Sequence, residues 1–159
     1  MTDFLWDAGT SGFIVAPFDL LTTELNSLAD GSGATSSVGG TSGVFQQSNY
    51  GSAIQGIIGF FPGASFTPAS GSPALLGWFL GSAGSGFEAV VANTDLPRAP
   101  DFVIPFIGSN AYGAFAFLSA GPPVMLPPWG HKIFVMNHTG TALPSSSNQL
   151  VVGPNAVKY

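Results

Sequence analysis

The sequence predicts an all-β chain, an antiparallel β-sandwich or jelly-roll-like domain with a short N-terminal arm and helix. Three observations predict it. Short apolar runs rich in Phe, Val, Ile, Tyr and Trp alternate with Gly, Pro, Ser and Asn at spacings of roughly 8–15 residues. Only one segment has helical periodicity, so no helices are available to connect parallel strands. Hydrophobic residues make up 45% of the chain, which is enough to build a core although cysteine is absent.

The chain divides by composition into two regions. Residues 1–43 are predicted to form an N-terminal arm, a short helix and a Gly/Ser linker, and residues 44–159 the β-sandwich domain. The linker corresponds to residues 31–43, which are rich in Gly, Ser and Thr and contain almost no large side chains.

The helix is expected over Phe18–Gly31. Asp19 can cap its start, and Gly31 fits a C-terminal stop. Leucines recur at i, i+4 and i+7, namely at Leu21, Leu25 and Leu28. A helix of about three turns is unstable alone, so this leucine stripe must pack against the same subunit or a neighbouring one.

Strands are expected in the apolar runs that follow the linker. They are Ser52–Phe60, Ala74–Leu80, Phe87–Ala92, Asp101–Phe106, Tyr112–Phe117, Val124–Leu126, Lys132–Asn137, Gln149–Val152 and Asn155–Lys158. Most prolines fall between these runs, as expected for a residue that cannot donate to a β-ladder. Pro105 falls inside one run and is expected to mark an edge strand or a bulge.

Formal charges are few and unevenly placed. Only 7% of the residues are charged, whereas an ordinary soluble domain has about 25%. The runs Gly31–Phe87 and Phe102–His131 contain no Asp, Glu, Lys or Arg. Surface charges keep a monomer soluble and discourage association through sheet edges. Long uncharged runs therefore indicate a surface that is covered by neighbouring subunits.

The same composition excludes several classes of function. The net charge is −5, and the only basic residues are Arg98, Lys132 and Lys158, so we expect no direct nucleic-acid binding and no docking on anionic lipid. No apolar run is long enough for a membrane helix. The first residues do not read as a signal peptide. Without cysteine, neither disulfides nor zinc–thiolate sites can form.

No pattern of residues indicates catalysis, a cofactor or a metal. His131 and His138 lie seven positions apart, and residues at that spacing face opposite sides of a strand. Asp95, Arg98 and Asp101 are expected to form a salt bridge that holds a Pro-rich corner. Neither a G-x-S-x-G elbow nor a phosphate-binding loop is present. We therefore expect no catalytic, cofactor-binding or metal-binding residues, and no enzymatic activity.

Two tryptophans are expected in different places. Trp78 lies within an apolar run and is predicted to be a core residue. Trp129 lies in Leu-Pro-Pro-Trp-Gly-His and is predicted to be exposed at a loop tip. An exposed indole on a β-sandwich is a possible glycan contact, which is an alternative function for this chain.

Four stretches resemble small structural proteins of tailed bacteriophages. They are residues 20–29 (LLTTELNSLA), residues 66–80 with Gly-Trp-Phe-Leu, residues 97–105 (PRAPDFVIP) and residues 126–154 (LPPWGHKIFVMNHTGTALPSSSNQLVVGP). The resemblance implies a virion component, assembled in the host cytoplasm, with a β-sandwich or jelly-roll domain. It implies a head decoration (cement) protein that binds the major capsid protein and copies of itself, commonly as trimers. A tail or collar accessory protein, or a glycan-binding adhesion module on the virion surface, is the alternative.

The apolar residues of the arm are the candidate interface. They are Phe4, Leu5, Trp6, Phe13, Ile14 and Val15. Such residues can add a strand to the sheet edge of a partner. The alternative is that they complete the sheet of their own subunit.

Overall fold

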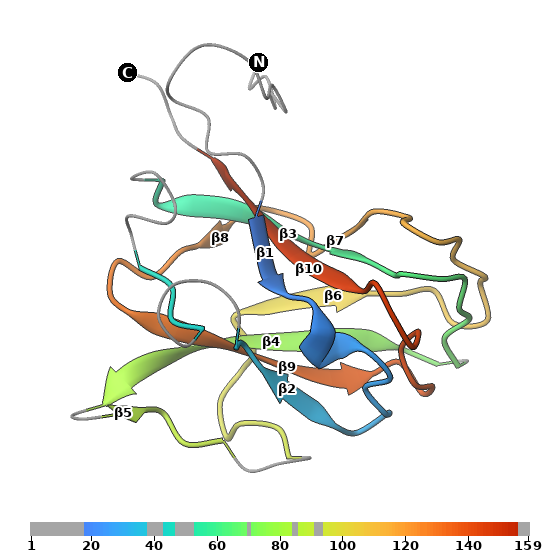
Figure 1. The fold of residues 1–159 in the computed structure, drawn as a ribbon, viewed down its shortest axis with the longest axis horizontal. Helices are drawn as coiled ribbons and strands as arrows, with labels where there is room; N and C mark the ends of the chain where they lie inside the picture. The colour runs from blue at the N-terminus through green and yellow to red at the C-terminus, as the bar shows by residue number, and fades with distance from the viewer. Residues whose placement is uncertain are drawn as a thin grey trace.

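The computed structural model describes residues 18–37, 43–46, 53–69, 71–83, 86–90 and 94–155. Within these ranges the chain is almost entirely β, with strands arranged in two five-stranded antiparallel sheets and one short 3₁₀ turn (Figure 1). The predicted all-β class is confirmed.

The first sheet is built around the pairing of β10 with β3. Its order is β1 (Phe18–Leu21), β10 (Gln149–Asn155), β3 (Gln55–Phe61) and β7 (Leu118–Ser119), and β8 (Val124–Met125) also pairs with β3. β10 and β3 pair from Gln149 opposite Phe61 to Asn155 opposite Gln55. That ladder occupies one side of β3. On its other side, β3 pairs with both β7 and β8.

The second sheet is built around the pairing of β4 with β9. Its order is β2 (Gly33–Thr35), β9 (His131–His138), β4 (Ala74–Ala83) and β5 (Gly86–Phe87), and β6 (Phe102–Pro105) also pairs with β4. The β4–β9 ladder runs from Ala74 opposite His138 to Gly81 opposite His131. In the described residues β6 pairs with β4 alone, so the prediction that Pro105 marks an edge strand is confirmed.

One large buried cluster contains side chains of both sheets. From the first sheet come Leu20, Ile58, Phe60, Leu150 and Val152, and from the second Leu75, Ile104, Ile133 and Val135. A smaller cluster lies on the other face of β4 and β9 and contains Trp78, Leu80, Leu96, Phe134 and Met136. Successive side chains of a strand point to opposite faces, so the two central strands of this sheet are buried on both faces.

The predicted N-terminal helix is wrong. Residues of Phe18–Gly31 instead form β1, the 3₁₀ turn η1 (Thr23–Leu25) and a connection to β2. Ser27 has a left-handed backbone with φ of 57°, which a helix interior does not accommodate. Pairing of β1 with β10 satisfies the backbone N–H and C=O groups that a helix would satisfy by its own hydrogen bonds. Leu21 and Leu25 are fully buried. Their spacing therefore reflects burial in a strand and a turn rather than one face of a helix.

Three other expectations change in detail. The predicted strand Tyr112–Phe117 is wrong. Tyr112 makes only an isolated bridge with Phe66, and the nearest strand, β7, begins after Phe117. β10 continues past the predicted end at Val152 as far as Asn155, and the rest of the predicted strand Asn155–Lys158 lies outside the described residues. Residues 33–35 of the predicted linker form β2, which pairs with β9.

The two sheets present their outer strands on two edges of the molecule. β2 contacts η1, which follows β1, and we call residues 18–37 the amino-terminal edge. β6 contacts β7, and we call residues 102–125, which include β6, β7 and β8, the neutral edge. The neutral edge lies wholly within the uncharged run that begins at Phe102.

Candidate functional site

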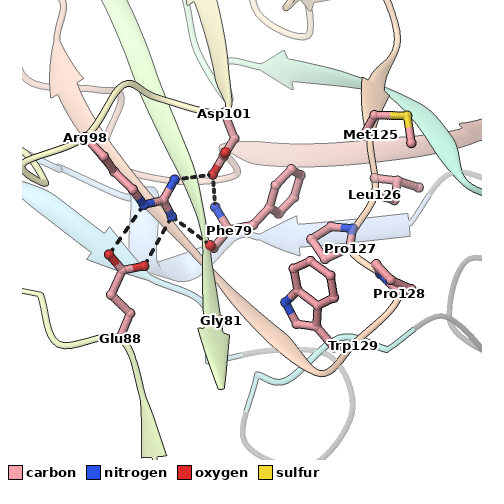
Figure 2. A pocket seen from close by; sticks show the side chains of 10 residues that line it. All are labelled: Phe79, Gly81, Glu88, Arg98, Asp101, Met125, Leu126, Pro127, Pro128 and Trp129. Carbon is pink, nitrogen blue, oxygen red and sulfur yellow. Dashed lines mark hydrogen bonds and ion pairs between the residues drawn. The ribbon is translucent and has the colours of Figure 1, made fainter. Parts of the chain in front are cut away.

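A cleft of about 550 Å³ opens beside β4 at Phe79 and Gly81 (Figure 2). Its size is that of a small-molecule site. It is lined by Phe79, Gly81, Glu88, Arg98, Asp101, Met125, Leu126, Pro127, Pro128 and Trp129. One wall is charged and the opposite wall is apolar.

The charged wall is organised by Arg98. Its guanidinium donates to both carboxylate oxygens of Glu88 at 3.4 and 3.2 Å and to Oδ2 of Asp101 at 2.9 Å. It also donates to the carbonyl of Phe79 at 2.9 Å. Burial acts against the charge of Arg98, but the hydrogen bonds and charges of the two carboxylates outweigh it and raise the pKa of Arg98. The result is a hydrogen-bonded cluster of one cation and two anions.

This cluster replaces a missing stretch of strand pairing. β6 pairs with β4 only as far as Gly77, and β5 pairs with β4 from Ser82 onward. Between them the Phe79 N–H donates to Oδ2 of Asp101 at 2.7 Å, and the Phe79 carbonyl accepts from Arg98. An unpaired backbone group would be costly here. The cluster therefore stabilises the fold and forms the cleft wall at once.

The apolar wall is the connection between β8 and β9. Leu126 and Pro127 are buried, whereas Met125 and Trp129 are 63% and 57% exposed. Nδ1 of His131 lies 2.9 Å from the Trp129 carbonyl, which holds the connection against β9. A side chain at Gly81 would place its Cβ only 3.7 Å from Nε1 of Trp129. The absent side chain of Gly81 keeps the cleft open between its two walls.

His131 supports this wall from inside the protein. The imidazole is fully buried, with ring centroids 6.2 Å from Phe45 and 5.3 Å from Phe79. Burial lowers the pKa of His131, and the hydrogen bond to Trp129 raises it by less. The ring is therefore neutral at pH 7 with Nδ1–H donating to the carbonyl, which gives it a structural role.

The predicted salt bridge is confirmed for Arg98 and Asp101, at 2.9 Å. Asp95 instead forms a 2.7 Å pair with His138. Glu88 was not anticipated from the sequence, because it reaches Arg98 only through the hairpin that β4 makes with β5. No signal in the local sequence indicates that contact.

The two histidines lie in different environments, since His131 is buried and the side chain of His138 is 39% exposed. Across the described ranges no group of three or more His, Cys, Asp or Glu side chains is placed to hold a metal ion. Nor does any helix there have the length and hydropathy to cross a membrane.

The tryptophans lie as expected, with Trp78 buried and Trp129 exposed between β8 and β9. A glycan contact at Trp129 stays a prediction. The candidate interface residues Phe4, Leu5, Trp6, Phe13, Ile14 and Val15 lie outside the described residues.

The exposed large hydrophobic side chains are a second feature of functional interest. Those in the described ranges are Ile54, Val103, Ile107, Phe115, Phe117, Met125 and Trp129. Ile54 lies in the uncharged run 31–87, and the other six lie in the uncharged run 102–131. Apolar exposure and lack of charge thus coincide, and five of the seven residues belong to the neutral edge.

Comparisons with protein-family models, with curated proteins and with solved structures give no match to this chain.

Proposed function

We propose that this chain is a structural component of a bacteriophage virion, a head decoration (cement) protein that stabilises the capsid. Its partners in this role are the major capsid protein and further copies of itself, arranged as a trimer. The observation that carries the proposal is the confinement of the described exposed large hydrophobic residues to the two uncharged runs. The resemblance of four stretches to phage structural proteins supports the same role.

The physical argument concerns the neutral edge. Burying apolar surface stabilises an association by about 25 cal/mol per Å², and a stable interface buries roughly 800 Å² on each partner. Ile107 and Phe115 are 66% and 60% exposed, and no charged side chain of residues 102–131 has to be desolvated with them. Such an edge is suited to contact with another protein.

We also infer the finer architecture from the shared core. The large buried cluster takes side chains from both sheets, which supports two sheets that pack face to face as a β-sandwich. The jelly-roll variant is proposed from the resemblance alone. The division at residue 43 and the role of the arm residues remain part of this proposal.

The test compares capsids assembled without this chain after addition of purified protein. Ile107→Lys with Phe115→Lys should lower capsid occupancy at least tenfold, because both substitutions place charge on the neutral edge. Thr23→Lys with Ala29→Lys adds the same charge at exposed positions of the amino-terminal edge and should leave occupancy unchanged.

Occupancy is measured by quantitative gel analysis of purified particles, and oligomeric state by light scattering. A wild-type chain that stays monomeric and binds no capsid would contradict the proposal. Equal occupancy of both double variants would exclude the neutral edge as the contact. Binding to isolated tails instead of heads would favour the tail or collar alternative.

A further inference from the structure

The cleft beside β4 presents an aromatic face and unused hydrogen-bonding atoms to the solvent. The Trp129 ring is 57% exposed, and its Nε1–H has no hydrogen-bond partner among the residues that the structure describes. On the charged wall, Asp101 uses Oδ2 for both of its hydrogen bonds, to Arg98 and to the Phe79 amide. Its Oδ1 therefore remains an available acceptor.

Both walls are held in place before any ligand arrives. Arg98 is fixed by four hydrogen bonds to Glu88, Asp101 and the Phe79 carbonyl. The Trp129 backbone is fixed by buried His131. A site whose groups are already ordered loses less conformational entropy when a ligand binds.

We propose that this cleft binds a neutral saccharide. One pyranose ring stacks on the Trp129 indole, and its hydroxyl groups donate to the carboxylates of Asp101 and Glu88 (Figure 2). A pyranose has an apolar face of C–H groups and a rim of hydroxyls. It therefore matches a cleft that has an indole on one wall and carboxylate acceptors on the opposite wall.

The charges of the cleft disfavour an anionic ligand. Two carboxylates face one guanidinium, so the wall has a net negative charge that repels phosphate, sulfate and uronate groups. Most N–H groups of Arg98 are already engaged by Glu88, Asp101 and Phe79. The same net charge attracts a cation, and the Trp129 indole can also contact one through its ring face. Tetramethylammonium is therefore the competing probe that a saccharide has to exceed.

The same geometry indicates binding without hydrolysis. A glycosidase needs one carboxyl group held protonated in an apolar setting as the general acid. Here both carboxylates accept hydrogen bonds from the same guanidinium, and their side chains are about one third exposed (35% and 34%). This inference goes beyond the capsid role and does not depend on it.

The test follows the indole N–H resonances of the ¹⁵N-labelled full chain. The probes are glucose, galactose, mannose, N-acetylglucosamine and their β-linked disaccharides, with tetramethylammonium and inorganic phosphate as charged comparisons. The Trp129 resonance is assigned by its loss in Trp129→Phe. We expect at least one saccharide to shift this resonance saturably, and to shift it more than tetramethylammonium or phosphate does.

Variants separate the cleft from the rest of the surface. Gly81→Leu places a side chain in the cleft, and its Cβ meets only Nε1 of Trp129, at an ordinary van der Waals distance of 3.7 Å. Gly81→Leu and Trp129→Ala should each weaken saccharide binding at least tenfold. Phe115→Ala, which removes an exposed aromatic ring outside the cleft, is the matched control and should bind as the wild type does.

Three results would overturn the proposal. They are no shift of the Trp129 resonance with any saccharide of the panel, saccharide binding that survives Gly81→Leu, and a larger response to tetramethylammonium or phosphate than to every sugar. Dispersed amide spectra of each variant confirm that a loss of binding is not a loss of folding.

Discussion

The two edges of the molecule differ in how their backbone groups are satisfied. The amino-terminal edge is bound to distant segments by polar side chains that the fold buries. Asn148 donates to the carbonyls of Leu25 and Pro144, and Asn137 donates to the carbonyl of Leu28. Asn148 and Asn137 are fully buried. This edge is therefore held within its own subunit.

The neutral edge is held by its strand ladders, by buried Phe102, Ile104 and Phe106, and by backbone hydrogen bonds to other segments, whereas its own side-chain hydrogen bonds lie near the surface. The Ile107 amide donates to the hydroxyl of Tyr112, and the Gly121 amide to the hydroxyl of Ser119, both in exposed positions. Phe115 and Phe117 remain 60% and 45% exposed. Both edges contribute side chains to the core, but in the described residues only the neutral edge also has large apolar side chains exposed for a partner.

The largest expected effect tests the first half of this comparison. Asn148→Ala removes donors to Leu25 and Pro144 and the acceptor of the Gly63 amide. Leaving such buried groups unsatisfied should lower the free energy of unfolding by about 3 kcal/mol. Asn110→Ala, at an exposed position of the neutral edge, should change it by less than about 0.5 kcal/mol. Urea denaturation measures the free energy of unfolding of both variants. Equal losses would contradict the conclusion that buried asparagines hold the amino-terminal edge within its own subunit.

A smaller effect is expected from adding one methyl group near each edge. In Gly33→Ala the new Cβ would meet the ring of Phe134 and the sulfur of Met136, both buried, and should cost about 2 kcal/mol of stability. In Gly59→Ala it would meet the ring of Phe117, which packs on Phe61 but is 45% exposed and so is less enclosed than Phe134. We expect less than about 1 kcal/mol there.

Thermal and urea denaturation of the two glycine variants check this order. A larger loss for Gly59→Ala would mean that Phe117 is fixed in place. The neutral edge would then be more rigid than its exposure indicates.

The smallest expected effect is the pH dependence of the contribution that Glu24, in the amino-terminal edge, makes to stability. Burial acts to raise the pKa of Glu24, but hydrogen bonds from Ser37 and from the Thr22 amide outweigh it, and the pKa is lowered from its ordinary value of 4.5. A carboxylate with a lowered pKa stabilises the fold above its ordinary pKa, and that stability is lost as the pH falls through the folded-state value.

The variant Glu24→Gln should remove this contribution. It should be less stable than the wild type at about pH 6, and the difference should shrink at about pH 3 as Glu24 becomes protonated. Urea midpoints at the two pH values provide the measurement. A difference that is the same at both would show that Glu24 acts by shape rather than by charge.

Local patterns were sufficient for most central strands and insufficient for the N-terminal segment. The runs that became β3, β4 and β9 combine apolar side chains with flanking Gly and Pro, and they were predicted close to their observed bounds. The leucine spacing of residues 21–28 fits both a helix and a buried turn. What decided between them is the pairing of Leu21 with Leu150, which lies far away in sequence.

The cleft shows the same limit. Arg98 and Asp101 are three residues apart, so their ion pair was predictable from spacing. Glu88 enters the cluster through a hairpin, and Trp129 lines the same cleft through the separate connection from β8 to β9. No local pattern encodes a contact between segments that only the sheets bring together.

The sequence by itself determined the all-β class, the scarcity of charge and the placement of the uncharged runs, because these depend on composition and short-range alternation. Only the tertiary structure decided which uncharged residues face solvent, which edge is held by buried asparagines, and that an ion cluster and an indole share one cleft. The physical reason is that burial and hydrogen-bond satisfaction depend on strand pairing between distant segments, which local sequence does not specify.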